Sequence, residues 1–165
     1  MEIKDILKRL REDKGFKEWE KSNKGSFLAH VFKLLDDINQ DDWQVGFYNK
    51  DDTITTFILT PNDIKKAQTE NIFKKPEAKI SPLNEKKIKI DITEALQTAE
   101  KIQTTEYKQE IPMKIITILQ KLDIGQVYNI TYVTQTFKIL NLKIDTSNGK
   151  VLKKKIESIM DFKQS

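Results

Sequence analysis

Residues 113–152 read MKIITILQKLDIGQVYNITYVTQTFKILNLKIDTSNGKVL, and this stretch decides the fold. Apolar and β-branched residues alternate with polar ones in three runs, at residues 113–119, 126–134 and 137–144. A period of two residues is typical of half-buried β-strands. The runs are followed by a turn at residues 147–149 (SNG), because Asn and Gly tolerate the positive φ that a tight turn requires. The sequence therefore predicts three antiparallel strands in series.

A helix is predicted just before these strands. Its apolar stripe consists of Ala95, Leu96, Ala99 and Ile102. Asp91 and Thr93 are candidate N-caps, and the helix must end before Pro112, because proline disfavours a helical residue in front of it. After the strands, residues 151–162 fit either a returning strand or a final helix.

The N-terminal half has a weaker version of the same order. Apolar residues at helical spacing within residues 2–21 predict a helix, and Gly15 interrupts it, giving two short helices or one kinked helix. Residues 26–35 fit a strand or a helix by periodicity alone. We interpret them as a strand, because residues 43–49 and 53–60 alternate as strands do.

Each half of the chain is predicted to contain a helix followed by three strands, so the same order of elements occurs twice. The alternation of Trp43, Val45 and Phe47 matches that of Tyr128, Ile130 and Tyr132. We therefore predict an α+β protein of two units, residues 1–60 and 93–165, each with a helix packed on a three-stranded antiparallel meander. A Pro- and Lys-rich connector, residues 61–92, joins them, with a helical turn or two at residues 63–73. Chance similarity between two meanders is the alternative to a repeat.

The second unit resembles a PepSY module over residues 88–152. That family has an Ala-bearing helix, here residues 93–99 (TEALQTA), followed by strands that end in a D-x-x-x-G-x-V turn, here residues 145–151 (DTSNGKV). The first unit has residues 60–63 (TPND) in place of that turn and would be a degenerate copy. The resemblance implies a tandem α-β-β-β repeat.

The resemblance also implies a function. PepSY modules are best known from protease propeptides and envelope proteins, where they are thought to bind and restrain peptidases. It implies a non-catalytic protein- or peptide-binding or regulatory module. An edge strand, or the groove between helix and sheet, would receive the partner, since main-chain groups on an edge can pair with another strand. The candidate partner-binding residues are Trp43, Gly46, Tyr48, Tyr128 and Tyr132. Gly46, in mid-strand, also predicts a bulge or a close contact above the sheet.

Composition excludes several kinds of site. The chain has no cysteine and one histidine, His30, so thiolate metal sites, cysteine nucleophiles and imidazole pairs are excluded. Residues 36–42 (DDINQDD) lack the glycine and the bidentate Glu of an EF-hand, and the five glycines form no phosphate-binding motif. We expect no catalytic residues, no metal and no cofactor, and therefore no enzyme.

The charge is balanced. Twenty-nine basic and 25 acidic residues give a formal charge of +4, without the concentrated basic stripe of a dedicated nucleic-acid binder. A basic nucleic-acid-associated protein that uses sheet aromatics and lysines is the alternative function. No stretch has the apolar core of a secretory signal or the roughly 20 apolar residues of a membrane span. We therefore expect a cytoplasmic protein without a membrane partner.

Overall fold

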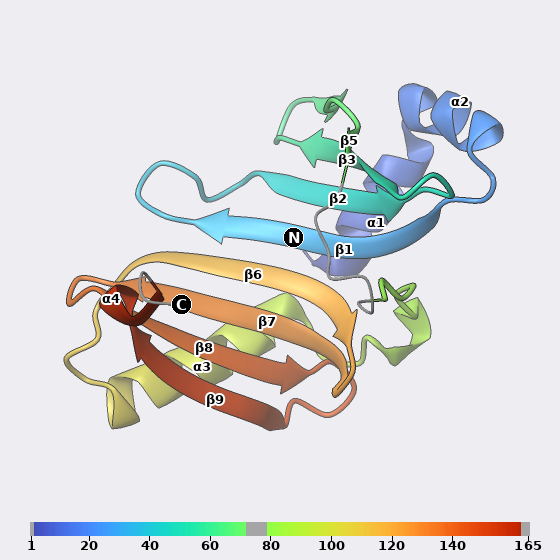
Figure 1. The fold of residues 1–165 in the computed structure, drawn as a ribbon. Helices are drawn as coiled ribbons and strands as arrows, with labels where there is room; N and C mark the ends of the chain where they lie inside the picture. Colours follow the sequence, from blue (N-terminus) through green and yellow to red (C-terminus); the bar gives the residue numbers. More distant parts are fainter. Residues whose placement is uncertain (1, 72–78, 163–165) are drawn as a thin grey trace.

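The structure is a computed structural model that describes residues 2–71 and 79–162 (Figure 1). The elements, in chain order, are α1 (Ile3–Glu12), α2 (Lys14–Ser22), β1 (Phe27–Leu35), β2 (Trp43–Tyr48), β3 (Thr53–Leu59), β4 (Ile64–Lys66), β5 (Glu70–Asn71), the 3-10 turn η1 (Glu85–Lys87), α3 (Ile92–Glu106), β6 (Pro112–Leu122), β7 (Gly125–Thr134), β8 (Lys138–Asp145), β9 (Val151–Ser158) and α4 (Ile159–Phe162).

One antiparallel sheet joins both halves of the chain (Figure 1). Its strand order is β4-β3-β2-β1-β6-β7-β8-β9, and the short strand β5 also pairs with β3. β1 and β6 lie at the centre, where residues 30–35 pair with residues 115–120. The predicted α+β class with an antiparallel sheet is confirmed.

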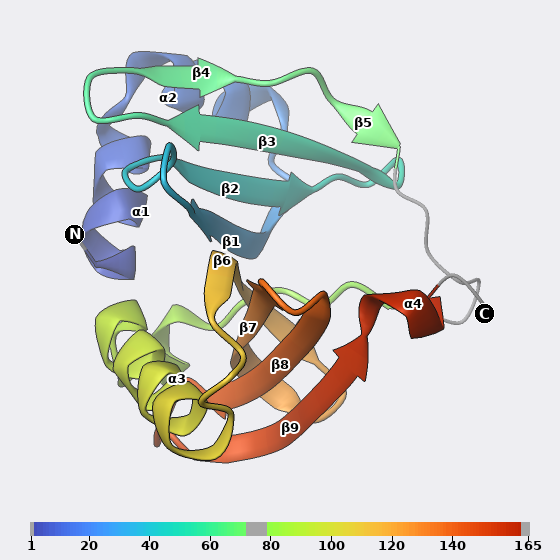
Figure 2. The same cartoon turned by 90° about the vertical axis from the view of Figure 1, so that its left-hand side faces the viewer.

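Helices α1 and α3 lie on the same face of the sheet (Figure 2). Their buried residues follow helical spacing, with Ile3, Ile6, Leu7 and Leu10 on α1 and Ile92, Ala95 and Ala99 on α3. The Thr93 hydroxyl donates a hydrogen bond of 2.8 Å to Glu2 and so links the N-terminal ends of the two helices. A single apolar core therefore extends along the covered face. No helix in the described residues is long and apolar enough to cross a bilayer.

The predicted break in the N-terminal helix occurs at Asp13, before Gly15. The backbone N–H of Asp13 donates to Leu10 and closes α1, while its carboxylate accepts from the backbone N–H of Phe16 at 2.9 Å and caps α2. An N-cap side chain satisfies one of the unpaired N–H groups of a helix start. Two short helices are therefore the correct alternative of the two that the sequence left open.

Strand pairing corrects one expectation and decides a second that the sequence left open. The helical turn predicted at residues 63–73 is wrong within the described residues, because Ile64–Lys66 and Glu70–Asn71 pair with β3 as strands; residues 72 and 73 lie outside the described residues. Residues 151–162 contain both alternatives, since strand β9 is followed by the short helix α4. Each half therefore adds at least one strand to its predicted meander.

The turn between β8 and β9 forms as predicted. Asp145 accepts hydrogen bonds from the backbone N–H and the hydroxyl of Ser147 at 2.7 and 2.6 Å. Gly149 has a φ of +75°, a backbone conformation that residues other than glycine rarely adopt. The turn brings β9 back along β8 as the last strand of the sheet.

Candidate functional site

Three of the five predicted partner-binding residues lie in the core. Trp43, Tyr128 and Tyr132 are 4%, 0% and 2% exposed, on the face that the helices cover. The Tyr128 hydroxyl donates to the backbone oxygen of Ile90 at 2.8 Å. Burial raises the pKa of Tyr128 above its ordinary value and raises the pKa of Tyr132 to about 12. These rings stabilise the fold and offer no exposed stacking surface.

The other two residues, Gly46 and Tyr48, lie on β2 on the face of the sheet away from the helices. Gly46 pairs with His30, where the register of β1 shifts, and a Cβ at Gly46 would overlap three atoms of the imidazole ring. The predicted close contact above Gly46 is confirmed. Tyr48 packs on Phe27 with ring centroids 5.3 Å apart, and its hydroxyl donates to Asp52. The five residues therefore do not form one site.

Gly46→Ala is expected to lower the free energy of unfolding by about 1–3 kcal/mol, the usual range for overpacking. The cause is overlap with the His30 ring, so the double variant Gly46→Ala/His30→Ala should be coupled, losing less stability than the two single losses added together. Urea unfolding of the four proteins measures this coupling. Strictly additive losses would show that the His30 ring is not what requires glycine here.

β9 is the long edge of the sheet. It pairs with β8 from Val151, opposite Ile144, to Ser158, opposite Lys138, and no described strand pairs with its outer side. Residues 151–155 are exposed. Figure 1 shows β9 as the lowest strand, with no described element beyond it. Along such an edge, alternate backbone N–H and C=O groups point outward and can pair with another strand.

Lysines surround this edge. Lys153 pairs with Lys143 of β8 and Lys155 pairs with Asn141, so the side chains of Lys143, Lys153 and Lys155 share the face away from the helices. Burial lowers the pKa of Lys143, and the positive charges of Lys153 and Lys155 lower it further. The ammonium of Lys154 lies 2.6 Å from the Glu106 carboxylate on the helix side. The Lys155 ammonium also pairs with the carboxylate of Glu157 on the same face, so the open face of the β9 edge has three lysines against one carboxylate.

The other edge of the sheet is short and broken. β4 has three residues and β5 has two, and both pair with β3 along different parts of its length. Short edge strands are a common way to prevent unwanted strand pairing. Of the two edges, β9 has the geometry that accepts a further strand.

A groove lies on the covered face near the N-terminal end of α3. Two cavities of about 340 and 320 Å³ share Thr93 and Leu96 as lining residues. The ammonium of Lys33 lines the first and lies 4.2 Å from the ring centroid of Trp43, a cation–π contact. Burial lowers the pKa of Lys33. A groove thus lies between helix and sheet, and its walls contain both polar and apolar side chains.

The largest cavity described has a volume of about 730 Å³ and lies at the end of the sheet where α2 leads into β1. Its residues come from the turns at 22–26 (SNKGS) and 49–53 (NKDDT), with others from α2, β3 and the β4 segment. Sequence patterns predict these two segments as turns and do not indicate that they meet. Their shared Asn and Lys content is the signal that could have drawn attention to them.

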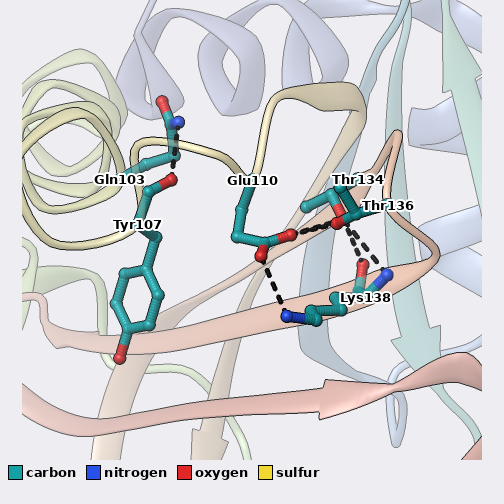
Figure 3. Close-up of polar contacts among 6 residues, drawn as sticks. All are labelled: Gln103, Tyr107, Glu110, Thr134, Thr136 and Lys138. Atoms are coloured by element: carbon teal, nitrogen blue, oxygen red, sulfur yellow. Dashed lines mark hydrogen bonds and ion pairs between the residues drawn. The ribbon is translucent and has the colours of Figure 1, made fainter.

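Glu110 is a buried carboxylate in the loop between α3 and β6 (Figure 3). Hydroxyls of Thr136 and Thr134 donate to one oxygen, and the Lys138 ammonium lies 3.2 Å from the other. The hydrogen bond from Thr136, followed by the interaction with Lys138, lowers the pKa of Glu110. Both oxygens have partners, so this cluster fastens the loop to the β7–β8 turn and leaves no free base.

Carboxylates with lowered pKa values do not converge. Hydrogen bonds within their own turns lower the pKa of Asp36 and of Asp145, the hydrogen bond from Arg11 lowers that of Glu85, and Glu110 is held as described. None of these four lines a cavity described here. In the part of the chain that the structure describes, no three acidic or histidine side chains are grouped to hold a metal ion.

Comparison with known proteins gives a likeness in fold. No family model and no curated protein matches this chain. A solved structure from Clostridium difficile 630, titled "Crystal structure of a putative lipoprotein", is similar, with a TM-score of 0.56 and 16% sequence identity. The match covers 90% of this chain and 97% of that one, so the likeness in fold extends over most of both chains.

Proposed function

We propose that this chain is a non-catalytic binding module that takes an extended, acidic segment of a partner protein as an additional strand beside β9. The observation that carries the proposal is an edge strand of eight residues with no described strand on its outer side, exposed at residues 151–155 and bordered by lysines. Strand addition provides affinity through main-chain hydrogen bonds and specificity through alternate side chains.

Charge specifies the partner. A strand added to β9 would place every second side chain on the face of Lys153 and Lys155, because side chains alternate between faces. Acidic residues at those alternate positions would neutralise the positive charge that lowers the pKa of Lys143. The partner segment is therefore one with Asp or Glu at every second position.

The proposal includes a repeat. From the centre outward, β1 to β4 follow α1 and α2 in the same order in which β6 to β9 follow α3, and the two central strands are antiparallel. Glu2 and Thr93 join corresponding helix ends. These correspondences support two PepSY-like units, and they favour the binding or regulatory role that such modules have, with restraint of a peptidase as one form.

A labelled peptide tests the function directly. We expect a fluorescent eight-residue peptide of alternating Glu and Val to bind the intact protein with saturable anisotropy. Lys153→Glu/Lys155→Glu should weaken binding about tenfold or more, because two attractions become repulsions. The matched control, Lys4→Glu/Lys8→Glu on the exposed side of α1, makes the same change in net charge and should bind like the original protein.

Two further peptides separate strand addition from general attraction to anions. A peptide of the same composition with its Glu and Val residues in separate blocks should bind much more weakly, as should an alternating peptide with N-methyl groups along one edge. Equal binding of all three peptides would contradict strand addition and indicate general attraction between charges. Binding of a thymidine oligonucleotide at physiological salt would favour the nucleic-acid alternative.

The cytoplasmic location stays a prediction. The similar solved structure is titled as that of a putative lipoprotein, and nothing else bears on where this chain is located.

A further inference from the structure

The large cavity beside α2 has a positively charged rim. Four exposed lysines line it, Lys21, Lys24, Lys50 and Lys66, against one carboxylate, Asp51. Within the described residues none of these lysines is within ion-pair distance of an acidic group. Figure 1 shows that α2 leads into β1 at the end of the sheet where the β2–β3 turn lies, which brings together the segments that contain Lys21, Lys24 and Lys50. An anion would therefore meet ammonium groups that have no ion-pair partner among the described residues.

The inner lining is a fixed network of hydroxyl and amide groups. Asn49 is its centre: its side-chain oxygen accepts from the Ser26 hydroxyl at 2.5 Å, and its amide donates to Thr53 and Thr55 at 2.9 Å each. Thr55 is buried, and its hydroxyl lies 3.1 Å from that of Thr69. The network holds β1, the β2–β3 hairpin and the β4–β5 segment together before any ligand arrives.

The hydroxyl groups of Thr55 and Thr69 have one proton more than their shared hydrogen bond uses. The hydroxyls of Thr55 and Thr69 share one hydrogen bond, which uses one of their two protons, and the Asn49 amide already donates to Thr55. Within the described residues the second hydroxyl proton has no protein acceptor, and because Thr69 is exposed, that proton is open to solvent or to a ligand in the cavity. A ligand hydroxyl or phosphate oxygen in the cavity would provide one, because a hydroxyl is a donor as well as an acceptor.

Gly25 positions one of the lysines. A Cβ at Gly25 would overlap the last carbon atoms and the ammonium of Lys50, so the absence of a side chain lets Lys50 lie across the α2–β1 turn. Trp19 completes the wall, and its other side packs on Phe47 and Phe57 with ring centroids 5.2 Å away. An aromatic wall beside polar groups suits the ring of a polyhydroxy compound.

We propose that this cavity binds a phosphate ester of a polyol or sugar. The lysines bind the phosphate, the network centred on Asn49 binds hydroxyl groups, and Trp19 packs against the ring. A volume of about 730 Å³ is within the range of small-molecule sites. The site lies among the strands at the end of the strand order opposite to β9, so it is separate from the proposed peptide-binding edge.

Calorimetry on the full chain tests the site with inositol monophosphate, inorganic phosphate and inositol. Saturable binding is expected for inositol monophosphate, about tenfold tighter than for either fragment, since phosphate and hydroxyl contacts both contribute. Lys50→Gln should weaken it about fivefold, whereas Lys101→Gln on α3 should leave it unchanged. Gly25→Ala should weaken it about threefold with an unchanged unfolding midpoint, because only the flexible end of Lys50 is displaced.

The outcomes are distinct. No saturable binding of inositol monophosphate, equal affinity for inorganic phosphate, or equal effects of Lys50→Gln and Lys101→Gln would each overturn the assignment. Cosedimentation with phosphatidylcholine vesicles containing phosphatidylinositol, displaced by inositol monophosphate, would support the site and identify a lipid headgroup as the source. Binding of the free ester without cosedimentation would support the site and identify a soluble ligand.

Discussion

Phe16→Ala is expected to lower the free energy of unfolding by about 3–5 kcal/mol, the range for removing a buried aromatic ring. Phe16 is 1% exposed and is the buried residue through which α2 reaches the core. Its ring lies 5.2–5.7 Å from those of Trp19, Phe47 and Phe57. Removing it leaves a cavity under α2 that three rigid rings cannot fill. Urea unfolding, followed by circular dichroism, measures the loss.

Phe27→Ala is the matched control. Phe27 has the same side chain, but it is half-buried and packs on Tyr48 alone among the aromatic rings of the described residues. We expect a loss less than half that of Phe16→Ala, since the area returned to water is smaller. A loss equal to or larger than that of Phe16→Ala would show that the aromatic cluster is not the main attachment of α2.

Leu140→Ala is expected to lower the free energy of unfolding by about 2–5 kcal/mol and to do so for the whole chain at once. Leu140 is fully buried on β8, between Tyr132 and Ile156 in the strand register. Both tryptophans lie in the other half, Trp19 on α2 and Trp43 on β2. Because β1 pairs with β6, the tryptophan fluorescence transition should move to lower urea together with circular dichroism.

Independent halves would give a different result. Tryptophan fluorescence would then keep its original midpoint while circular dichroism showed an earlier transition from the second half alone. Ile139→Ala provides the control, because Ile139 is the neighbouring residue of β8 and is only half-buried on the open face. It should shift both transitions together by a smaller amount.

Strict alternation made much of the sheet predictable from the sequence. In β7, Tyr128, Ile130 and Tyr132 take one face and Asn129 and Thr131 the other, as a period of two requires. Periodicity does not say which face a helix covers. Trp43, Tyr128 and Tyr132 were therefore assigned to a partner-binding surface, whereas the structure buries them on the face that the helices cover.

The edge strands were harder to predict. β9 reads VLKKKIES, without alternation, because its first residues are exposed on both faces and no burial constrains them. Its place is set by pairing with β8. β4 and β5 have so few residues that pairing with β3, rather than their own pattern, makes them strands.

The polar cavity could not be predicted because its residues are distant in sequence. Ser26, Asn49 and Thr69 meet only after the α2–β1 turn, the β2–β3 hairpin and the β4–β5 segment have been folded together. Turn-forming residues such as Asn and Ser are explained locally by the turns themselves. Their second role, as a joint lining, is a property of the tertiary structure.

Hydrogen exchange of the β9 amides, measured by mass spectrometry with and without the alternating Glu-Val peptide, tests the binding proposal most directly. The proposal predicts slower exchange in residues 151–158 when the peptide is present, because outward N–H groups become paired, with no change in α2 or in the groove beside Thr93. Protection confined to that groove, with β9 exchanging as before, would contradict strand addition at this edge.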